Sequence, residues 1–314
     1  MAQYRKPPQR NVNGIVLLNK PAGVSSNGIL QQVRRLFNAK KAGHTGALDP
    51  FATGLLPICF GEATKVSGLL LDSDKGYRAT LLLGQQSDSG DKDGEIIRRC
   101  EVPELSEVLL QNTLMQFEGE IEQVPPMYSA LKHQGKPLYW YARQGIEIER
   151  PARPIKILSL KLVSFEQTSS QSATVVFDVL CSKGTYVRTL GEDIAQALGT
   201  VGHLIALHRI QSGSLGADQM LSFEQMEQES EQGRLDELLL PVDLPVTHFE
   251  RIDLVADQAA WLRNGGQLRL PKPATDLVRF YNPEGICLGI GEWMEVEQRV
   301  KPKRLFNLPE LEQG

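Results

Sequence analysis

The chain has 314 residues, of which 41% are hydrophobic and 23% charged, and its formal net charge is −4. This size favours two domains, and the composition is that of an ordinary soluble globular protein. No stretch approaches the roughly 18 consecutive apolar residues that a membrane-spanning helix needs, and the charged, proline-containing start lacks the apolar core of a secretory signal. The four cysteines stand apart from one another, which argues against a zinc site or a disulfide framework and favours the cytoplasm.

Charge is distributed unevenly along the chain. Residues 1–70 contain nine Lys or Arg and two acids, whereas residues 218–250 contain nine acids and one base. Because the acidity is concentrated in one segment, the N-terminal part can face a polyanion although the whole chain is acidic. Residues 1–10 are predicted to form a flexible basic arm.

Apolar periodicity and turn residues predict the elements in chain order. In the first half they predict a buried strand over 14–21, a helix over 25–37 capped by Ser25 or Ser26, a strand over 77–84, a polar turn over 87–94, a helix over 105–117 and an exposed loop over 123–132. In the second half they predict two antiparallel strands over 155–165 and 173–181, a helix over 186–198, an acidic approach to a domain boundary over 218–250, and a small β-rich module with strands at 277–281 and 286–291.

Residues 43–54 place one carboxylate, Asp49, on a glycine-punctuated turn within the cationic segment. Taken alone, an aspartate before a proline is most often a turn residue. A solitary acid among cations, between glycines that let a ligand approach the backbone, also has the features of a reactive group. The surrounding cations would then be counter-charges for its substrate.

Six segments carry a wider pattern: 14–23, 43–57, 61–65, 75–77, 124–132 and 181–188. In content and order they resemble the bacterial tRNA pseudouridine synthases of the TruB family, which modify a uridine in the T loop. The resemblance covers most of residues 11–215. The end of the chain resembles the family's PUA-type RNA-binding module more loosely.

The resemblance implies an α+β fold. A catalytic domain with a mixed, mainly antiparallel sheet and flanking helices and loops is expected over 11–250, with an RNA-gripping loop at about 123–152, and a small β-rich PUA-like domain over 251–314. The implied reaction is isomerisation of uridine to pseudouridine by base flipping and an aspartate nucleophile, with no cofactor and no metal. The implied partner is the T stem-loop of tRNA, and the enzyme is expected to be a cytoplasmic monomer without a membrane or an obligate protein partner.

Three residues match the family's catalytic positions. Asp49 matches the nucleophile, and Arg188 matches the arginine that pairs with it and would lower its pKa. Tyr77 matches the aromatic residue that stacks on the uracil and is a candidate for the proton transfer at C5. Without the resemblance, a surface arginine and a core tyrosine are the better interpretations. Asp91 lies in a family-like Ser-Gly-Asp turn, which indicates a structural or RNA-positioning role.

The resemblance also implies contacts with RNA. His44 matches a residue that helps to hold the target out of its stack. Tyr186 matches a contact of the bound nucleotide, and Leu207 a residue that lines the pocket. Three lysines are candidate phosphate or structural contacts, with a solvated surface as the alternative: Lys20, Lys65 and Lys132.

Two alternative functions would each have their own marks in the sequence. A non-catalytic RNA-binding or RNA-folding protein on the same scaffold would be marked by replacement of Asp49, but Asp49, Tyr77 and Arg188 are all present, which favours catalysis. A glycoside hydrolase would need a second carboxylate at a set separation. Glu62 is distant from Asp49 in the sequence and lies in a Gly-Glu-Ala-Thr-Lys turn, so this function is disfavoured.

Overall fold

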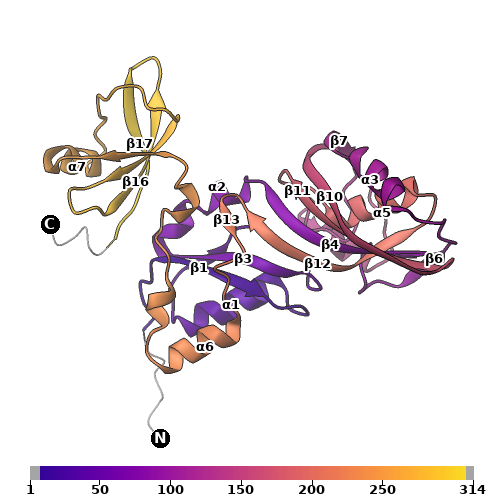
Figure 1. The fold of residues 1–314 in the computed structure, drawn as a ribbon. Helices are drawn as coiled ribbons and strands as arrows, with labels where there is room; N and C mark the ends of the chain where they lie inside the picture. Colours follow the sequence, from indigo (N-terminus) through magenta and orange to yellow (C-terminus); the bar gives the residue numbers. More distant parts are fainter. Residues whose placement is uncertain (1–7, 309–314) are drawn as a thin grey trace, which may run out of the picture.

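The protein was analysed as a computed structural model that describes residues 8–308. Its main feature is a nine-stranded sheet with the order β1-β3-β12-β4-β11-β10-β7, to which β2 adds beside β3 and β13 beside β12 (Figure 1). The strands are β1 (Gly14–Lys20), β2 (Ala42–His44), β3 (Thr53–Phe60), β4 (Lys75–Leu83), β7 (Gly119–Gln123), β10 (Arg153–Ser169), β11 (Ser172–Cys181), β12 (Gly202–Ser212) and β13 (Leu215–Gly216). Their pairing is antiparallel except for the parallel contact between β12 and β3. The predicted α+β fold with a mainly antiparallel sheet is confirmed.

The described residues contain seven α-helices, of which some cover this sheet and others lie outside it. They are α1 (Ser26–Leu36), α2 (Ser67–Leu71), α3 (Glu107–Met115), α4 (Leu138–Ala142), α5 (Val187–Ala197), α6 (Phe223–Glu231) and α7 (Ala256–Arg263). Helix α1 begins after Ser25, whose Oγ accepts a hydrogen bond from the backbone N–H of Gly28 at 3.1 Å. No helix within residues 8–308 is both long enough and apolar enough to cross a membrane.

Two hydrophobic clusters divide the sheet into two lobes. One buries α1 and α6 against β1 and β3, and the other buries α3 and α5 against β4, β10 and β11 (Figure 1). Strand β12 lies between β3 and β4 and therefore joins the lobes. The segments that carry the candidate site residues converge at this junction between the lobes.

A second, four-stranded sheet forms the C-terminal module. It consists of β14 (Glu250–Asp253), β15 (Leu277–Tyr281), β16 (Cys287–Met294) and β17 (Arg299–Leu305) in that order. Its core is continuous with that of β1 and β3, since Ile15 and Leu55 belong to the same cluster as Phe280. The predicted β-rich module is confirmed, whereas its PUA-like character and the boundary near residue 250 stay predictions.

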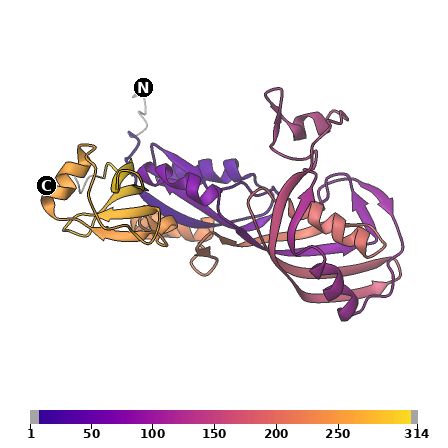
Figure 2. The same cartoon turned by 90° about the horizontal axis from the view of Figure 1, so that it is seen from above.

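The segment over 123–152 leaves the body of the sheet. It contains β8 (Lys132–His133), β9 (Lys136–Pro137) and α4, and it stands away from the sheet in the view from above (Figure 2). A short hairpin of β5 (Gln85–Ser87) and β6 (Ile96–Arg99) encloses the predicted polar turn.

Most of the predicted basic arm, residues 1–7, lies outside the described residues. Arg10 does not behave as part of a free arm. Its backbone N–H donates to Asn38 O at 2.7 Å, and its side chain forms an ion pair with Asp236.

Candidate active site

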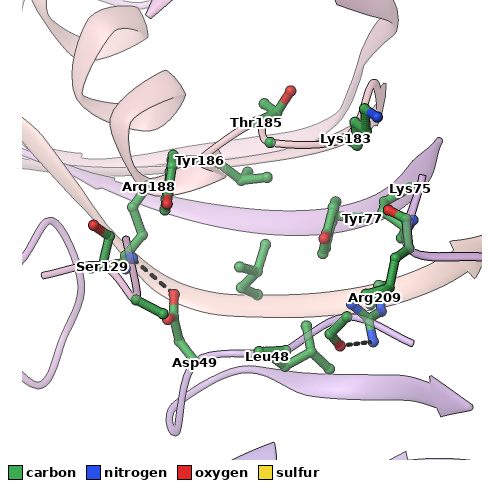
Figure 3. Close-up of a pocket in the computed structure, with 17 residues that line it drawn as sticks. Leu48, Asp49, Lys75, Tyr77, Ser129, Lys183, Thr185, Tyr186, Arg188 and Arg209 are labelled. Carbon is green, nitrogen blue, oxygen red and sulfur yellow. Dashed lines mark hydrogen bonds and ion pairs between the residues drawn. The ribbon is translucent and has the colours of Figure 1, made fainter. Parts of the chain in front are cut away.

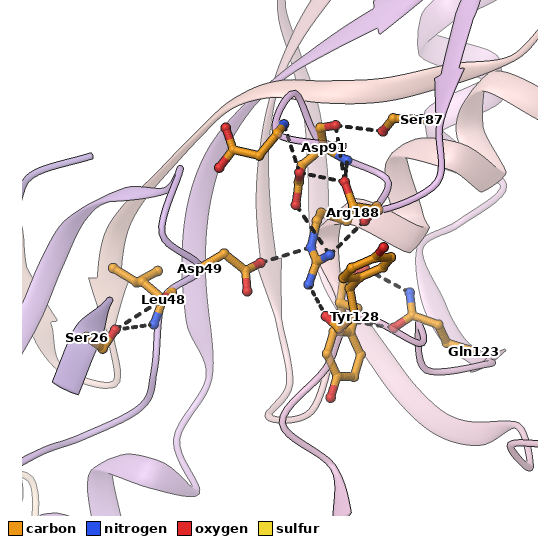
Figure 4. A network of polar contacts seen from close by, with 11 residues as sticks. Ser26, Leu48, Asp49, Ser87, Asp91, Gln123, Tyr128 and Arg188 are labelled. Carbon is orange, nitrogen blue, oxygen red and sulfur yellow. Dashed lines mark hydrogen bonds and ion pairs between the residues drawn. The ribbon is translucent and has the colours of Figure 1, made fainter. Parts of the chain in front are cut away.

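Asp49 lies on the connection between β2 and β3, which is held from both sides. Ser26 Oγ accepts a hydrogen bond from Leu48 N at 2.7 Å and lies 3.0 Å from Leu48 O, to which it donates (Figure 4). On the other side, Lys20 Nζ donates to Pro50 O at 3.2 Å. The residues before and after Asp49 are therefore both fixed, which leaves its carboxylate little freedom to move.

Arg188 is the group that faces this carboxylate. It is the second residue of α5, its side chain is only 4% exposed, and its Nε lies 2.9 Å from Asp49 Oδ2 (Figure 4). The rest of the guanidinium contacts Asp91 Oδ2 at 3.3 Å, Ser89 O at 2.7 Å and Tyr128 O at 2.8 Å. These acceptors fix the plane of the guanidinium. Because the Asp49 side chain stays 39% exposed, it is the member of the pair that a ligand can reach.

Asp91 supports Arg188 from the polar turn. Its Oδ1 accepts hydrogen bonds from Ser89 Oγ at 2.7 Å and from Asp93 N at 3.1 Å, while Oδ2 faces the guanidinium. The turn itself is closed by Ser87 Oγ, which donates to Asp91 O at 2.6 Å. This geometry fits the structural role considered for Asp91.

Burial raises the pKa of Asp49 above its ordinary value. Arg188 acts in the opposite direction, and the nearby Asp91 adds to the rise. The predicted effect of Arg188 is present, since the guanidinium lowers the pKa of Asp49, but the net shift is upward because the desolvation of the carboxylate outweighs this attraction.

A cavity of about 270 Å³ opens beside the ion pair (Figure 3). The structure brings five of the predicted site residues to its lining from four separate segments: Asp49, Tyr77, Tyr186, Arg188 and Leu207. Burial raises the pKa of Tyr77 and that of Tyr186, so both hydroxyls are protonated at neutral pH. The cavity thus combines one reachable carboxylate, two aromatic rings and an apolar side chain.

The remaining predicted residues lie outside this cavity. His44 lies on β2 and is partly exposed; burial and the charge of Arg209 lower its pKa, which favours the neutral imidazole. Lys132 is exposed at the start of β8. Lys65 donates to Glu62 Oε2 at 2.6 Å and to Leu305 O at 2.8 Å, and so ties the catalytic part to β17.

The prediction that Lys20 contacts RNA does not fit this structure. Its side chain has no exposed surface, and its Nζ donates to Pro21 O at 2.8 Å and Val24 O at 2.7 Å in addition to Pro50 O. Burial lowers its pKa to about 8. A phosphate cannot reach this ammonium group, so the contacts support a structural role for Lys20.

Sequence reasoning missed Arg209. It lies on β12, is 1% exposed and lines the cavity near Tyr77 (Figure 3). Its Nε donates to Leu55 O at 2.6 Å and its Nη2 to Gly46 O at 3.0 Å, so it spans the two ends of the Asp49 connection. The one available signal is a charged residue in an apolar run, and the sequence pattern does not predict β12 itself.

Three family models match consecutive parts of the chain. They describe the TruB family pseudouridylate synthase N-terminal domain at residues 34–187, the tRNA pseudouridylate synthase B C-terminal domain at 188–247, and the C-terminal part of pseudouridine synthase II TruB at 251–306. A solved structure of a Cbf5-Nop10-Gar1 complex contains a chain of the same fold, with a TM-score of 0.72 and 24% identity, over 99% of this chain and 92% of that one. The fold and the matched models define the class as pseudouridylate synthase.

Two relatives extend the match to nearly full length. The tRNA pseudouridine synthase B of Hydrogenovibrio crunogenus is 61% identical over 96% of this chain and 97% of its own. The enzyme of the same name from a Marinomonas species is 47% identical over 98% of this chain and 99% of its own. The chain belongs to the TruB family.

Proposed function

We propose that this protein converts one uridine in the T loop of tRNA into pseudouridine, with Asp49 as the nucleophile. The relatives that it matches over nearly their full length are named tRNA pseudouridine synthase B, which supports tRNA as the substrate. The observation that carries the proposal is the 2.9 Å ion pair between Asp49 and the buried Arg188 at the wall of a cavity that also contains Tyr77.

Pseudouridine formation requires a carboxylate at the position that Asp49 occupies. The N1–C1′ bond of uridine breaks, the uracil turns, C5 bonds to C1′, and the proton lost from C5 is balanced by one gained at N1. An ionised Asp49 can bond covalently to the substrate or stabilise a cationic sugar. Arg188 favours that ionised form, and it is held by enough other acceptors to stay in place while Asp49 reacts.

The uridine must leave its stack before it can enter the cavity, because its reacting atoms are inaccessible inside a folded loop. The segment over 123–152 offers groups for holding such an RNA. Tyr139 and Trp140 are exposed, and Lys136 Nζ lies 3.5 Å from the centre of the Trp140 ring. Exposed aromatic rings beside cations are typical of surfaces that bind single-stranded or looped RNA. The proposed reaction needs no membrane and no obligate protein partner, and a cytoplasmic monomer suffices for it.

Replacement of Asp49 tests the proposal. Asp49→Asn keeps the shape of the side chain but removes its nucleophilic oxygen, so release of the C5 hydrogen from a T-stem-loop RNA should cease while RNA binding persists. Asp93→Asn, an exposed carboxylate on the polar turn whose contact to Asp91 is through the backbone, is the matched control and should keep full activity. Turnover retained in a pure Asp49→Asn preparation would exclude Asp49 from the mechanism.

A further inference from the structure

Within the described part of the chain, Arg209 is a buried cation without a carboxylate partner. Among residues 8–308, no acidic oxygen lies within 4.0 Å of its guanidinium, and its hydrogen bonds go to two backbone carbonyls, Leu55 O and Gly46 O. A guanidinium has five N–H donors, so three remain beyond these two carbonyls, and the Tyr77 hydroxyl is the nearby side-chain acceptor for one of them. Burying a charge in this way is unfavourable unless water or a ligand in the cavity supplies the remaining acceptors.

The neighbours of Arg209 do not compensate its charge. Burial, with a smaller contribution from the charge of Arg209, lowers the pKa of Lys20, His44 and Lys75, and the pKa of Lys75 falls to about 8. Lys75 Nζ is itself occupied by Leu70 O at 2.7 Å and by Ser73 O at 2.5 Å. The cavity therefore has two different ends, with Asp49 and Arg188 at one and the excess positive charge at the other (Figure 3).

The register of the sheet relates Arg209 to the proposed stacking residue. Arg209 on β12 is directly opposite Tyr77 on the antiparallel β4. Directly opposite residues have their side chains on the same face of a sheet, with Cβ atoms about 4.5–5.5 Å apart. A base stacked on the Tyr77 ring would therefore lie beside a guanidinium that has N–H donors beyond those bonded to the backbone.

We propose that Arg209 is a further catalytic residue, whose N–H groups beyond those bonded to the backbone donate to a carbonyl oxygen of the target uracil and stabilise the negative charge that it acquires when the glycosidic bond breaks. The inference rests on the proposed function. When N1–C1′ breaks, its electron pair moves onto the uracil and is shared by N1, O2 and O4, while C1′ becomes cationic or bonds to Asp49. The charge disappears again when C5 bonds to C1′, the C5 proton leaves and N1 gains a proton.

A buried donor that is already in position stabilises this transient anion more than the neutral carbonyl of bound uridine. Arg209 should therefore affect the rate of bond cleavage more than the affinity for RNA. If Arg209 only held the connection that carries Asp49, its replacement would slow the reaction of every substrate to the same extent. The stability of the departing uracil anion would then make no difference. This difference provides the test.

The test compares uridine with 5-fluorouridine at the target position of one T-stem-loop RNA, under single-turnover conditions. Fluorine stabilises the uracil anion, so cleavage of this nucleoside depends less on Arg209. For Arg209→Gln we expect conversion of uridine to slow about 10²–10³-fold, as for loss of one oxyanion donor, and consumption of N-linked 5-fluorouridine to slow about tenfold less. Affinity for the RNA should change little. Both rates come from one preparation, so any unfolded fraction cancels in their ratio.

Arg78→Gln is the matched control, because Arg78 lies on β4 in an exposed ion pair with Asp178 at 2.8 Å and should leave both rates unchanged. If Arg209→Gln does not fold, Arg209→Lys keeps the charge but not the directed N–H pair, and it should alter the ratio in the same direction. An unchanged ratio of the two rates, or a loss confined to RNA binding, would overturn the inference. If the wild-type protein forms no pseudouridine at all, the proposed function fails instead.

Discussion

The close approach of β3 to β12 should make Gly54 irreplaceable. Gly54 has φ +99°, and β3 and β12 are in parallel register there, with Arg209 opposite Gly54. A Cβ atom at Gly54 would lie 2.4 Å from Arg209 O and 2.7 Å from Arg209 N. Both are backbone atoms, so they cannot rotate away, and the two strands would have to separate.

The cost of Gly54→Ala follows from these two features. A positive φ costs a residue with a side chain about 1–3 kcal/mol, and forcing packed groups apart adds about 1–3 kcal/mol. We expect the free energy of unfolding to fall by roughly 4 kcal/mol and the melting temperature by on the order of 10 °C. Activity should fall as well, because the displaced strand β12 carries Arg209. Gly54 itself lies at the end of the connection that carries Asp49.

Gly43→Ala provides a control in the same motif. Gly43 has no positive φ, and a Cβ there would meet no heavy atom within 4 Å. Its stability should stay within about 0.5 kcal/mol of the wild type. Urea denaturation followed by circular dichroism, with single-turnover assays at low denaturant, measures both effects. If Gly54→Ala unfolds at the same urea concentration as Gly43→Ala, the close approach of the strands does not constrain this position.

Two further predictions concern the carboxylate and the connection that carries it. Because Asp49 must be ionised to react and its pKa is raised, single-turnover activity should be lost as the pH falls, at a pH above the ordinary aspartate pKa of about 3.9. Asp91→Asn removes a like charge that raises this pKa, so the acid limb should move to lower pH; a limb that moves to higher pH would contradict the assignment. Ser26→Ala should destabilise the protein by about 1–3 kcal/mol per unpaired group of Leu48 and slow isomerisation. Ser25→Ala, which removes the cap of α1 at a cost of about 1 kcal/mol, should leave the rate unchanged, and equal rates in the two variants would exclude a positioning role for Ser26.

The elements that the sequence predicted well are those with one buried face. Strand β11 alternates between buried and partly exposed positions along its length, and α1 has a clear apolar stripe, so periodicity identifies both. Strand β12 lies between two other strands in the middle of the sheet, and its register with β4 shifts between Leu204 and Ala206 and again between Arg209 and Gln211. These irregularities break the alternation that a sequence pattern requires, which is why this strand was missed.

The site shows a similar division. Asp49 and Arg188 are far apart in the sequence, so only the resemblance to a known family predicts their 2.9 Å contact. Ser25 and Ser26 were equivalent candidates for the helix cap, but the fold uses Ser25 for the cap and Ser26 for the Asp49 connection. The burial of individual side chains could not be read from the sequence. It gives Lys20 a structural role and makes the net pKa shift of Asp49 upward.

The central claim is that Asp49 and its cavity isomerise one uridine of tRNA. Its most direct test is mass-spectrometric mapping of an unmodified tRNA transcript after incubation with the purified protein and no other component. We expect a single pseudouridine, located in the T loop, with the wild-type protein and none with Asp49→Asn. A pseudouridine formed outside the T loop, or its formation by the Asp49→Asn variant, would contradict the claim, as would a transcript left unmodified by the wild-type protein.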